Sequence, residues 1–129
     1  MANPNIVAVA TIYGESVGYN LTATTTTQLL EVSSGKLLKV NRITVANVDG
    51  TNAADVTLSV TKANFTSAGV TNFDTSGTFF IAKTISVPAD ATLVLLDTPI
   101  YLMEGDILKG GASAASDLDL VISYDVIAV

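Results

Sequence analysis

The chain has 129 residues, of which 49% are hydrophobic and 14% charged, with a formal net charge of -6 and no Cys or His. This length predicts one domain with a single core. The absence of Cys and His excludes disulfides, thiolate or imidazole metal sites and the usual Ser-His or Cys-His nucleophile pairs. The acidic balance argues against a nucleic-acid partner, because phosphate contacts need clustered Lys and Arg.

Residues 1–10 read as an extended N-terminal arm that leads into a first strand. Pro4 fixes its own φ and disfavours helix at the preceding residue. From Ile6 to Ile12 both faces are apolar, which indicates a strand buried on both sides, by the domain itself or by a neighbouring subunit. No basic residue precedes Lys36, so we expect mature sequence and not a secretory signal. No apolar run approaches the roughly 18 residues of a transmembrane helix, and we expect no membrane partner.

Residues 11–129 are expected to form one β-sandwich domain. Gly14 to Gly18 reads as a turn, and short strands follow over 19–23 and 28–32. The threonine run 24–27 favours extended backbone, in a strand or in an exposed connection between strands. A turn over 33–36 then leads into the most regular part of the chain.

The stretch 37–61 predicts a long β-hairpin. Two β-prone runs, 37–48 and 56–61, flank a tip over 49–55 in which Gly50 tolerates positive φ and Asp49 and Asn52 favour Asx-turns. In the first run the apolar residues change phase at Asn41-Arg42, which predicts a β-bulge or a bend from one sheet to another. In the second run Val and Leu alternate with Thr and Ser, so only one face should cover a core.

The rest of the chain continues as short strands and turns. In the long loop 63–77, Phe65 and Phe73 either anchor the loop or contact a partner. Strands are expected over 78–87, with Phe79, Ile81, Ile85 and Val87 on one face, then over 92–96, 100–103, from 107, and over 117–129. Turns separate them at 88–91, 97–99 and 104–106, and a small-residue loop at 110–116. The pattern predicts an all-β fold: a two-sheet antiparallel β-sandwich, jelly-roll-like, with about 8–10 short strands.

No residue cluster points to catalysis, a cofactor or a metal. Glu104 and Asp106 resemble an acid–base pair, but Gly105 between them favours a turn. Oxygen ligands for Ca²⁺ are available in the tip 49–55 and at Asp117 with Asp119, yet neither group has EF-hand spacing. Nothing in the sequence groups the four tyrosines into a sugar-binding platform: Tyr13, Tyr19, Tyr101 and Tyr124. We therefore expect no enzyme, no cofactor and no metal site.

Three strand-and-turn segments are recognisable: VANVDGTNAADVTLSV (45–60), YLMEGDILKGGAS (101–113) and ISYDV (122–126). With the stretches around them, 21–60 and 93–129, they resemble small virion structural proteins of tailed phages, especially cyanobacterial and marine phages. The resemblance implies a capsid decoration (cement) protein, or a neck or tail component, that is oligomeric on a symmetric particle.

Two functions from different classes follow. In the first, the chain is a non-enzymatic decoration protein made in the bacterial cytoplasm; it forms a homo-oligomer, with a trimer favoured, and stabilises the lattice of the major capsid protein on the outer virion surface. A neck, tail or vertex position is the alternative. In the second, it is a virion surface module that holds host glycans with the tip 49–55 and the loop 63–77. The residues expected at an interface are Asn3, Pro4, Asn5, Ile6, Val7, Asp49, Asn52, Phe65 and Phe73.

Overall fold

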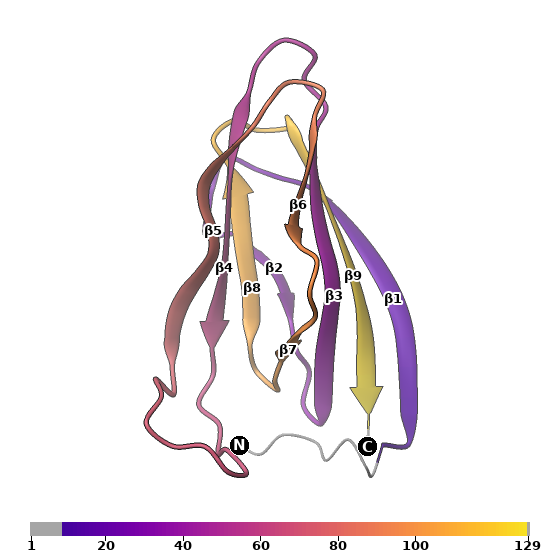
Figure 1. Cartoon of the computed structure of the whole chain (residues 1–129), viewed down its shortest axis with the longest axis vertical. Coiled ribbons are helices and arrows are strands. Elements are labelled where there is room, and N and C mark those ends of the chain that lie inside the picture. The colour runs from indigo at the N-terminus through magenta and orange to yellow at the C-terminus, as the bar shows by residue number, and fades with distance from the viewer. Residues whose placement is uncertain (1–8, 129) are drawn as a thin grey trace.

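The computed structural model describes residues 9–128, which form nine strands in two antiparallel sheets (Figure 1). The first sheet has the order β1-β9-β3-β6, with β7 also beside β3; its strands are β1 (Thr11–Asn20), β3 (Lys36–Asn47), β6 (Thr92–Leu96), β7 (Ile100–Leu102) and β9 (Leu118–Ala128). The second has the order β2-β8-β4-β5; its strands are β2 (Gln28–Glu31), β4 (Ala54–Lys62), β5 (Gly77–Val87) and β8 (Ile107–Ala112). The predicted all-β, two-sheet antiparallel sandwich is confirmed.

The strand order is that of a jelly roll. Both β6 and β7 pair with β3, and Asp97-Thr98-Pro99 separates them, so the two act as one interrupted strand. With that pair counted once, there are eight strands, four in each sheet. Successive strands change sheet except at β4 and β5, which are neighbours in the second sheet, and this is the arrangement of a jelly roll. The inner faces of both sheets supply the core, whose largest fully buried side chains include Ile43, Leu58, Leu108, Leu118, Leu120 and Ile122.

The predicted irregularity in β3 is a β-bulge. The register between β3 and β9 shifts between Val40 and Arg42, which leaves Asn41 as the additional residue. Because of this shift, Val40 and Ile43 both lie in the core although their positions differ in parity.

The predicted hairpin between β3 and β4 is wrong. The strands lie in different sheets: β3 pairs with β6, β7 and β9, whereas β4 pairs with β5 and β8. The connection 48–53 reverses the chain as expected, but it crosses the gap of about 10 Å between two packed sheets. Each strand has an apolar face, and the two faces are buried against each other across the core.

The predicted turn at Gly14 to Gly18 is also wrong. β1 is continuous and pairs residue by residue with β9, from Thr11 opposite Ala128 to Asn20 opposite Asp119. Neither glycine has a positive φ. Glycine permits a turn but does not require one, and here the ladder with β9 holds both glycines extended.

The predicted small-residue loop begins later than expected, because Gly110, Gly111 and Ala112 belong to β8 and are buried. A Cβ atom at Gly110 would lie 2.7 Å from the carbonyl oxygen of Thr57, and one at Gly111 would lie 2.3 Å from the carbonyl oxygen of Thr24. Backbone on both sides therefore requires glycine at these two positions of the strand.

Two register shifts between β4 and β5 interrupt the predicted apolar face of β5. Thr84 lies in one of them with φ +49°, and its backbone N–H donates to Oγ1 of Thr57 over 3.1 Å. Ala82 is consequently buried, while Phe79 and Ile85 stay exposed. As predicted, only one face of β4 contributes to the core, with Ala54, Val56, Leu58 and Val60. The hydroxyl-bearing face is not fully solvated, however, because Thr57 and Ser59 are also buried.

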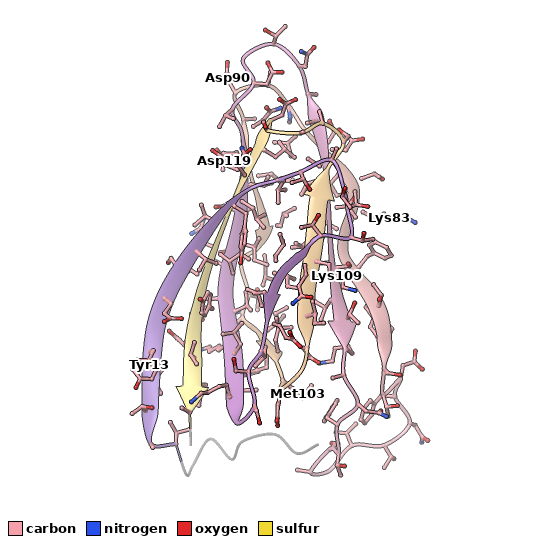
Figure 2. The ribbon with its side chains drawn as sticks, turned by 180° about the vertical axis from the view of Figure 1, so that it is seen from behind. Tyr13, Lys83, Asp90, Met103, Lys109 and Asp119 are labelled. Carbon is pink, nitrogen blue, oxygen red and sulfur yellow. The ribbon has the colours of Figure 1, made fainter. Side chains whose placement is uncertain are left out.

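The connections gather at two opposite ends of the sandwich (Figure 1). The upper end in that view holds the connections 21–27, 48–53, 88–91 and 113–117, and the lower end holds 32–35, 63–76 and 103–106. Figure 2 shows Asp90 and Asp119 near the upper end, Met103 near the lower end, and Tyr13 and Lys83 on opposite borders of the molecule.

Candidate interaction surfaces

The tip at the upper end is an internally bonded turn. Asp49 accepts hydrogen bonds from the backbone N–H of Thr51 over 2.8 Å and from the backbone and side chain of Asn52, each over 3.3 Å. These bonds hold the pKa of the Asp49 carboxyl below its ordinary value, the bond from Thr51 most of all. The predicted Asx-turn is therefore confirmed, and the two side chains proposed for an interface serve this turn.

Asn47 connects the tip to both sheets. Its side-chain amide donates to the carbonyl oxygens of Asn52 and Val87, each over 2.9 Å, and its side-chain oxygen accepts from the N–H of Asp49. The Asn47 side chain is buried with both its donor and its acceptor used. Sequence reasoning placed this residue at the end of a strand without a role, because an Asn that follows an apolar run gives no sign of its distant partner Val87.

The loop at the lower end is fixed by aromatic packing. The rings of Phe65 and Phe73 stack with centroids 5.3 Å apart and an angle of 26° between their planes, and Nζ of Lys62 lies 5.6 Å from the Phe65 centroid. Both phenylalanines are half-buried. Phe65 and Phe73 were predicted either to anchor the loop or to contact a partner, and this packing agrees with the anchor.

The tip and this loop cannot form one binding surface. β4 joins them, with the tip before Ala54 and the loop after Lys62, and a nine-residue strand is about 30 Å long. Figure 1 places the two connections at opposite ends of the sandwich. The predicted interface residues of the N-terminal arm, Asn3, Pro4, Asn5, Ile6 and Val7, lie outside the described residues.

Exposed apolar side chains lie on β5, the edge strand of its sheet. Phe80, which pairs with Ser59, is 54% exposed on the outer face, whereas Phe79 and Ile85 pair with the core residues Val60 and Val56 and are exposed at the edge of the core-side face. Nζ of Lys83 lies 5.1 Å from the centroid of the Phe80 ring. We call Phe79, Phe80 and Ile85 the β5 patch. Exposed apolar clusters of this kind mark contact sites for other proteins.

A groove opens between the two sheets on the side of β1 and β2. Two adjoining hollows of about 210 and 320 Å³ share Glu31, Val32 and Ser33, and the first is also lined by Glu15 and Tyr124. The apolar lining of the first hollow consists of Leu30, Val32, Leu38 and Val126, and Lys36 adds a positive charge. The two volumes lie at or below the lower end of the roughly 300–1,000 Å³ that is usual for small-ligand sites.

Two tyrosines lie on the inner face of β1 and β9, and one of them, Tyr124, lines this groove. The Tyr19 hydroxyl donates to the carbonyl oxygen of Leu29 over 2.6 Å, and burial raises its pKa. Burial also raises the pKa of Tyr124, followed by hydrogen bonding to and charge repulsion from Glu15, the residue opposite it in the ladder. The structure places these two tyrosines on one face of the sheet, but only Tyr124 lines the groove. The alternation of Tyr13, Glu15, Val17 and Tyr19 would have indicated it, had β1 been read as one strand.

Glu104 and Asp106 do not face a common site. Asp106 is buried, and its carboxylate accepts from the N–H of Met103 and of Ala63 and from Lys62. Glu104 accepts from the hydroxyl of Ser34 over 2.8 Å. Gly105 has φ +85°, and Asp106 N–H donates to the carbonyl of Met103, which is the predicted tight turn.

Within residues 9–128 no three Asp or Glu side chains are close enough to hold a metal ion. The same residues contain no helix that is long and apolar enough to span a bilayer.

The fold defines the chain as a jelly-roll β-sandwich, a class that includes viral capsid and lectin domains. No family model and no curated protein matches the sequence. Among solved structures, a chain of the Bacillus endospore appendages, described as disulfide-linked pili, is similar with 11% identity and a TM-score of 0.46, over 92% of this chain and 88% of that chain.

Two further similar chains come from infectious bursal disease virus. A structure of the Gx strain gives 8% identity and a TM-score of 0.35, and the VP2 subviral particle gives 10% identity and a TM-score of 0.32. Each match covers 92% of this chain and 41% of the viral chain. These neighbours come from a bacterial pilus and from a virus. Scores below 0.5 describe a loose likeness in chain path, so nothing about function follows from them.

Proposed function

We propose that this chain is a non-enzymatic structural protein of a tailed-phage virion, namely a capsid decoration (cement) protein. It is made in the bacterial cytoplasm, binds the major capsid protein on the outer capsid surface, and does so as a homo-oligomer, for which we expect a trimer. The support from sequence is the resemblance of segments 45–60, 101–113 and 122–126 to small virion proteins.

The structural observation that supports this proposal most is the β5 patch. Phe79, Phe80 and Ile85 expose apolar surface on an edge strand, and removal of such surface from water contributes about 25 cal/mol per Å². The two bulges in β5 and the nearby Lys83 oppose pairing of this edge with another strand. The patch is therefore suited to side-chain contacts with a partner. The N-terminal residues Asn3 to Val7 are the second proposed contact.

The mechanism is mass action. A protein that binds only the assembled lattice stabilises that lattice in proportion to its own affinity and concentration. No chemistry is required of the bound subunit. The high β content and compact jelly roll suit a surface component that must resist unfolding outside the cell.

The first test is the copy number of the chain in purified virions, measured by quantitative mass spectrometry against the major capsid protein. A stoichiometric ratio, or one trimer per threefold axis, is expected. A count of about a dozen per particle would overturn the decoration proposal and favour the neck, tail or vertex alternative.

The second test addresses the contacts. Phe80→Ser should weaken binding to particles that lack the protein, because it removes the most exposed ring of the β5 patch. Val121→Ser is the matched control, because Val121 is similarly exposed but belongs to the other sheet. Deletion of residues 1–9 should also lower occupancy. Equal binding by F80S and V121S would exclude the patch, and unchanged occupancy after the deletion would exclude the arm.

Recognition of host glycans is a second candidate, for which the groove is the specific observation. Tyr124 and Glu15 place an aromatic ring and a carboxylate in one apolar-lined hollow, whereas the rings of Phe65 and Phe73 in the loop 63–77 stack on each other. Binding to a glycan array that Tyr124→Ala abolishes would favour this candidate. Silence on the array together with stoichiometric binding to capsids would remove it.

A further inference from the structure

We propose that β1 is a self-association edge, at which two copies of this chain pair their β1 strands antiparallel about a twofold axis at Ser16. This inference goes beyond the proposed function, because it specifies a twofold contact between two chains that is separate from the contacts of the expected trimer. It begins with a comparison of the four edges of the sandwich.

Three of the four edges are blocked against strand pairing. β5 contains two register shifts, and β2 has only four residues with a shift between Gln28 and Leu30. The third edge, β6 with β7, is interrupted by Asp97-Thr98-Pro99 and has a shift opposite Ile43 and Thr44. Short strands, bulges and proline are the devices by which natural sheets prevent edge-to-edge association.

β1 has none of these devices. It pairs with β9 over ten residues without a register shift, contains no Pro, Lys or Arg, and lies at the border of its sheet (Figure 1). Its single charged residue, Glu15, points to the inner side, where it lines the groove, and such an inward charge is the one protective device that this edge carries. A long, regular and nearly uncharged edge presents unpaired backbone groups to another strand.

The residues that present those groups can be identified. The N–H of Leu21 donates to the carbonyl oxygen of Leu118, which continues the register of β1 and β9. In an antiparallel ladder, residues that bond the partner strand alternate with residues whose backbone groups point away. Odd-numbered residues of β1 therefore bond β9, and the backbone groups that face outward belong to Ile12, Gly14, Ser16, Gly18 and Asn20.

This set of five is symmetric about Ser16, which defines the register with a second copy. A twofold axis there pairs Ser16 with Ser16, Gly14 with Gly18 and Ile12 with Asn20, so every outward-facing residue has a partner. On the inner face Tyr13 meets Tyr19, an aromatic pair of the kind that stabilises antiparallel sheets.

Charge and strand length disfavour the two neighbouring registers. A shift of the axis to Val17 would place Ile12 opposite Thr22, beyond the end of β1. A shift of the axis to Glu15 would place the two Glu15 carboxylates directly opposite each other, which is destabilising. With the axis at Ser16, each Glu15 lies opposite Val17. The outer face of the edge offers no obstacle, because Gly14, Ser16 and Gly18 have small side chains or none.

The strand that pairs with the outer edge of β1 is thus the β1 strand of a second copy of this chain. A proline substitution tests this pairing. Ser16→Pro removes an outward N–H without removing a bond to β9, and proline is tolerated on edge strands in that orientation. Ser16→Ala is the matched control, because it keeps the N–H. We expect the weight-average mass by analytical ultracentrifugation to be half as large for S16P as for S16A. The ratio is the same whether the twofold contact joins two monomers or two trimers. A wild-type chain that is monomeric up to high micromolar concentration, or an S16P chain with the mass of S16A, would overturn the proposal.

A cross-link keeps the test informative should S16P fail to fold. The chain has no Cys, so Ser16→Cys introduces a single thiol on the proposed axis. Directly bonded residues of an antiparallel pair have Cα atoms about 5.5 Å apart, within the range that a disulfide bridges. S16C should therefore oxidise to a covalent dimer much faster than Thr26→Cys, an exposed position in the connection 21–27. Equal rates for the two variants would contradict the pairing.

Discussion

Lys62 donates from its ammonium group to the carboxylate of Asp106, and this ion pair joins the end of β4 to the turn that precedes β8. The Asp106 side chain is 1% exposed. The same carboxylate accepts from the N–H of Ala63 over 2.9 Å and of Met103 over 2.8 Å, so both of its oxygens have donors. One buried carboxylate therefore organises the lower end of the sandwich, where the loop 63–76 begins.

Asp106→Ala should lower the free energy of unfolding by about 3–5 kcal/mol, because it leaves Lys62 and two backbone N–H groups without their acceptor in a buried site. Urea denaturation followed by circular dichroism measures the change. Glu104→Ala is the control two residues away: its carboxylate accepts only from the exposed Ser34 hydroxyl, and the expected loss is about 1 kcal/mol or less. Equal losses for D106A and E104A would contradict the role given to Asp106.

Much of the fold could be predicted from local sequence. The predictions that were wrong share one physical origin. Alternating apolar residues and turn residues gave the all-β sandwich and the bulge at Asn41. The hairpin of β3 with β4 was wrong because the Asx-turn at Asp49 reverses the chain in the same way whether the strands pair or enter opposite sheets. Gly14, Gly18, Gly110 and Gly111 were read as turns or loops because their extended conformation depends on distant neighbours: β9, Thr57 and Thr24.

Less of the candidate surfaces could be predicted. Asp49, Asn52, Phe65 and Phe73 make internal contacts, and their place at an interface stays a prediction, because polarity or aromaticity in a loop does not distinguish a partner contact from an internal one. The β5 patch depends on bulges that no local pattern in β5 reveals. The pair of Glu15 and Tyr124 depends on a ladder between residues more than a hundred positions apart.

Gly111→Ala should destabilise the protein by about 1–3 kcal/mol, because the new methyl group would lie 2.3 Å from the carbonyl oxygen of Thr24 and backbone must shift to admit it. Thermal and urea denaturation measure the loss. Gly69→Ala provides the comparison, since a Cβ there meets no atom within 4 Å, and its stability should stay within about 0.5 kcal/mol of wild type. A stable G111A variant would mean that the connection 21–27 does not approach β8 as closely as described.

Thr84→Gly should stabilise the protein by up to about 1 kcal/mol. Thr84 has φ +49°, a left-handed conformation that costs a residue with a Cβ atom about 1–2 kcal/mol, and glycine avoids most of this cost while keeping the N–H that bonds Thr57. Ser86→Gly, two residues along the same strand, should instead destabilise by about 0.5–1 kcal/mol, because Ser86 has no positive φ and glycine adds only chain entropy in the unfolded state. The two variants should thus change the denaturation midpoint in opposite directions, and a loss of stability in T84G would refute the assignment of strain.

Glu15→Gln should lower the pKa of Tyr124 toward the ordinary tyrosine value without reaching it. Burial is the larger cause of the raised pKa and remains, whereas the charge and hydrogen bonding of Glu15 are lost or weakened. A raised pKa in the folded state means that neutral Tyr124 stabilises the fold; this contribution is complete below the unfolded value of about 10 and is lost as the pH rises through the folded pKa. NMR titration of the Tyr124 ring should show the decrease, and E15Q should lose less of its stability on alkaline titration than wild type. Glu31→Gln is the control, because Glu31 lines the same groove but does not contribute to the Tyr124 shift, so an equal decrease in E31Q would contradict the pairing of Glu15 with Tyr124.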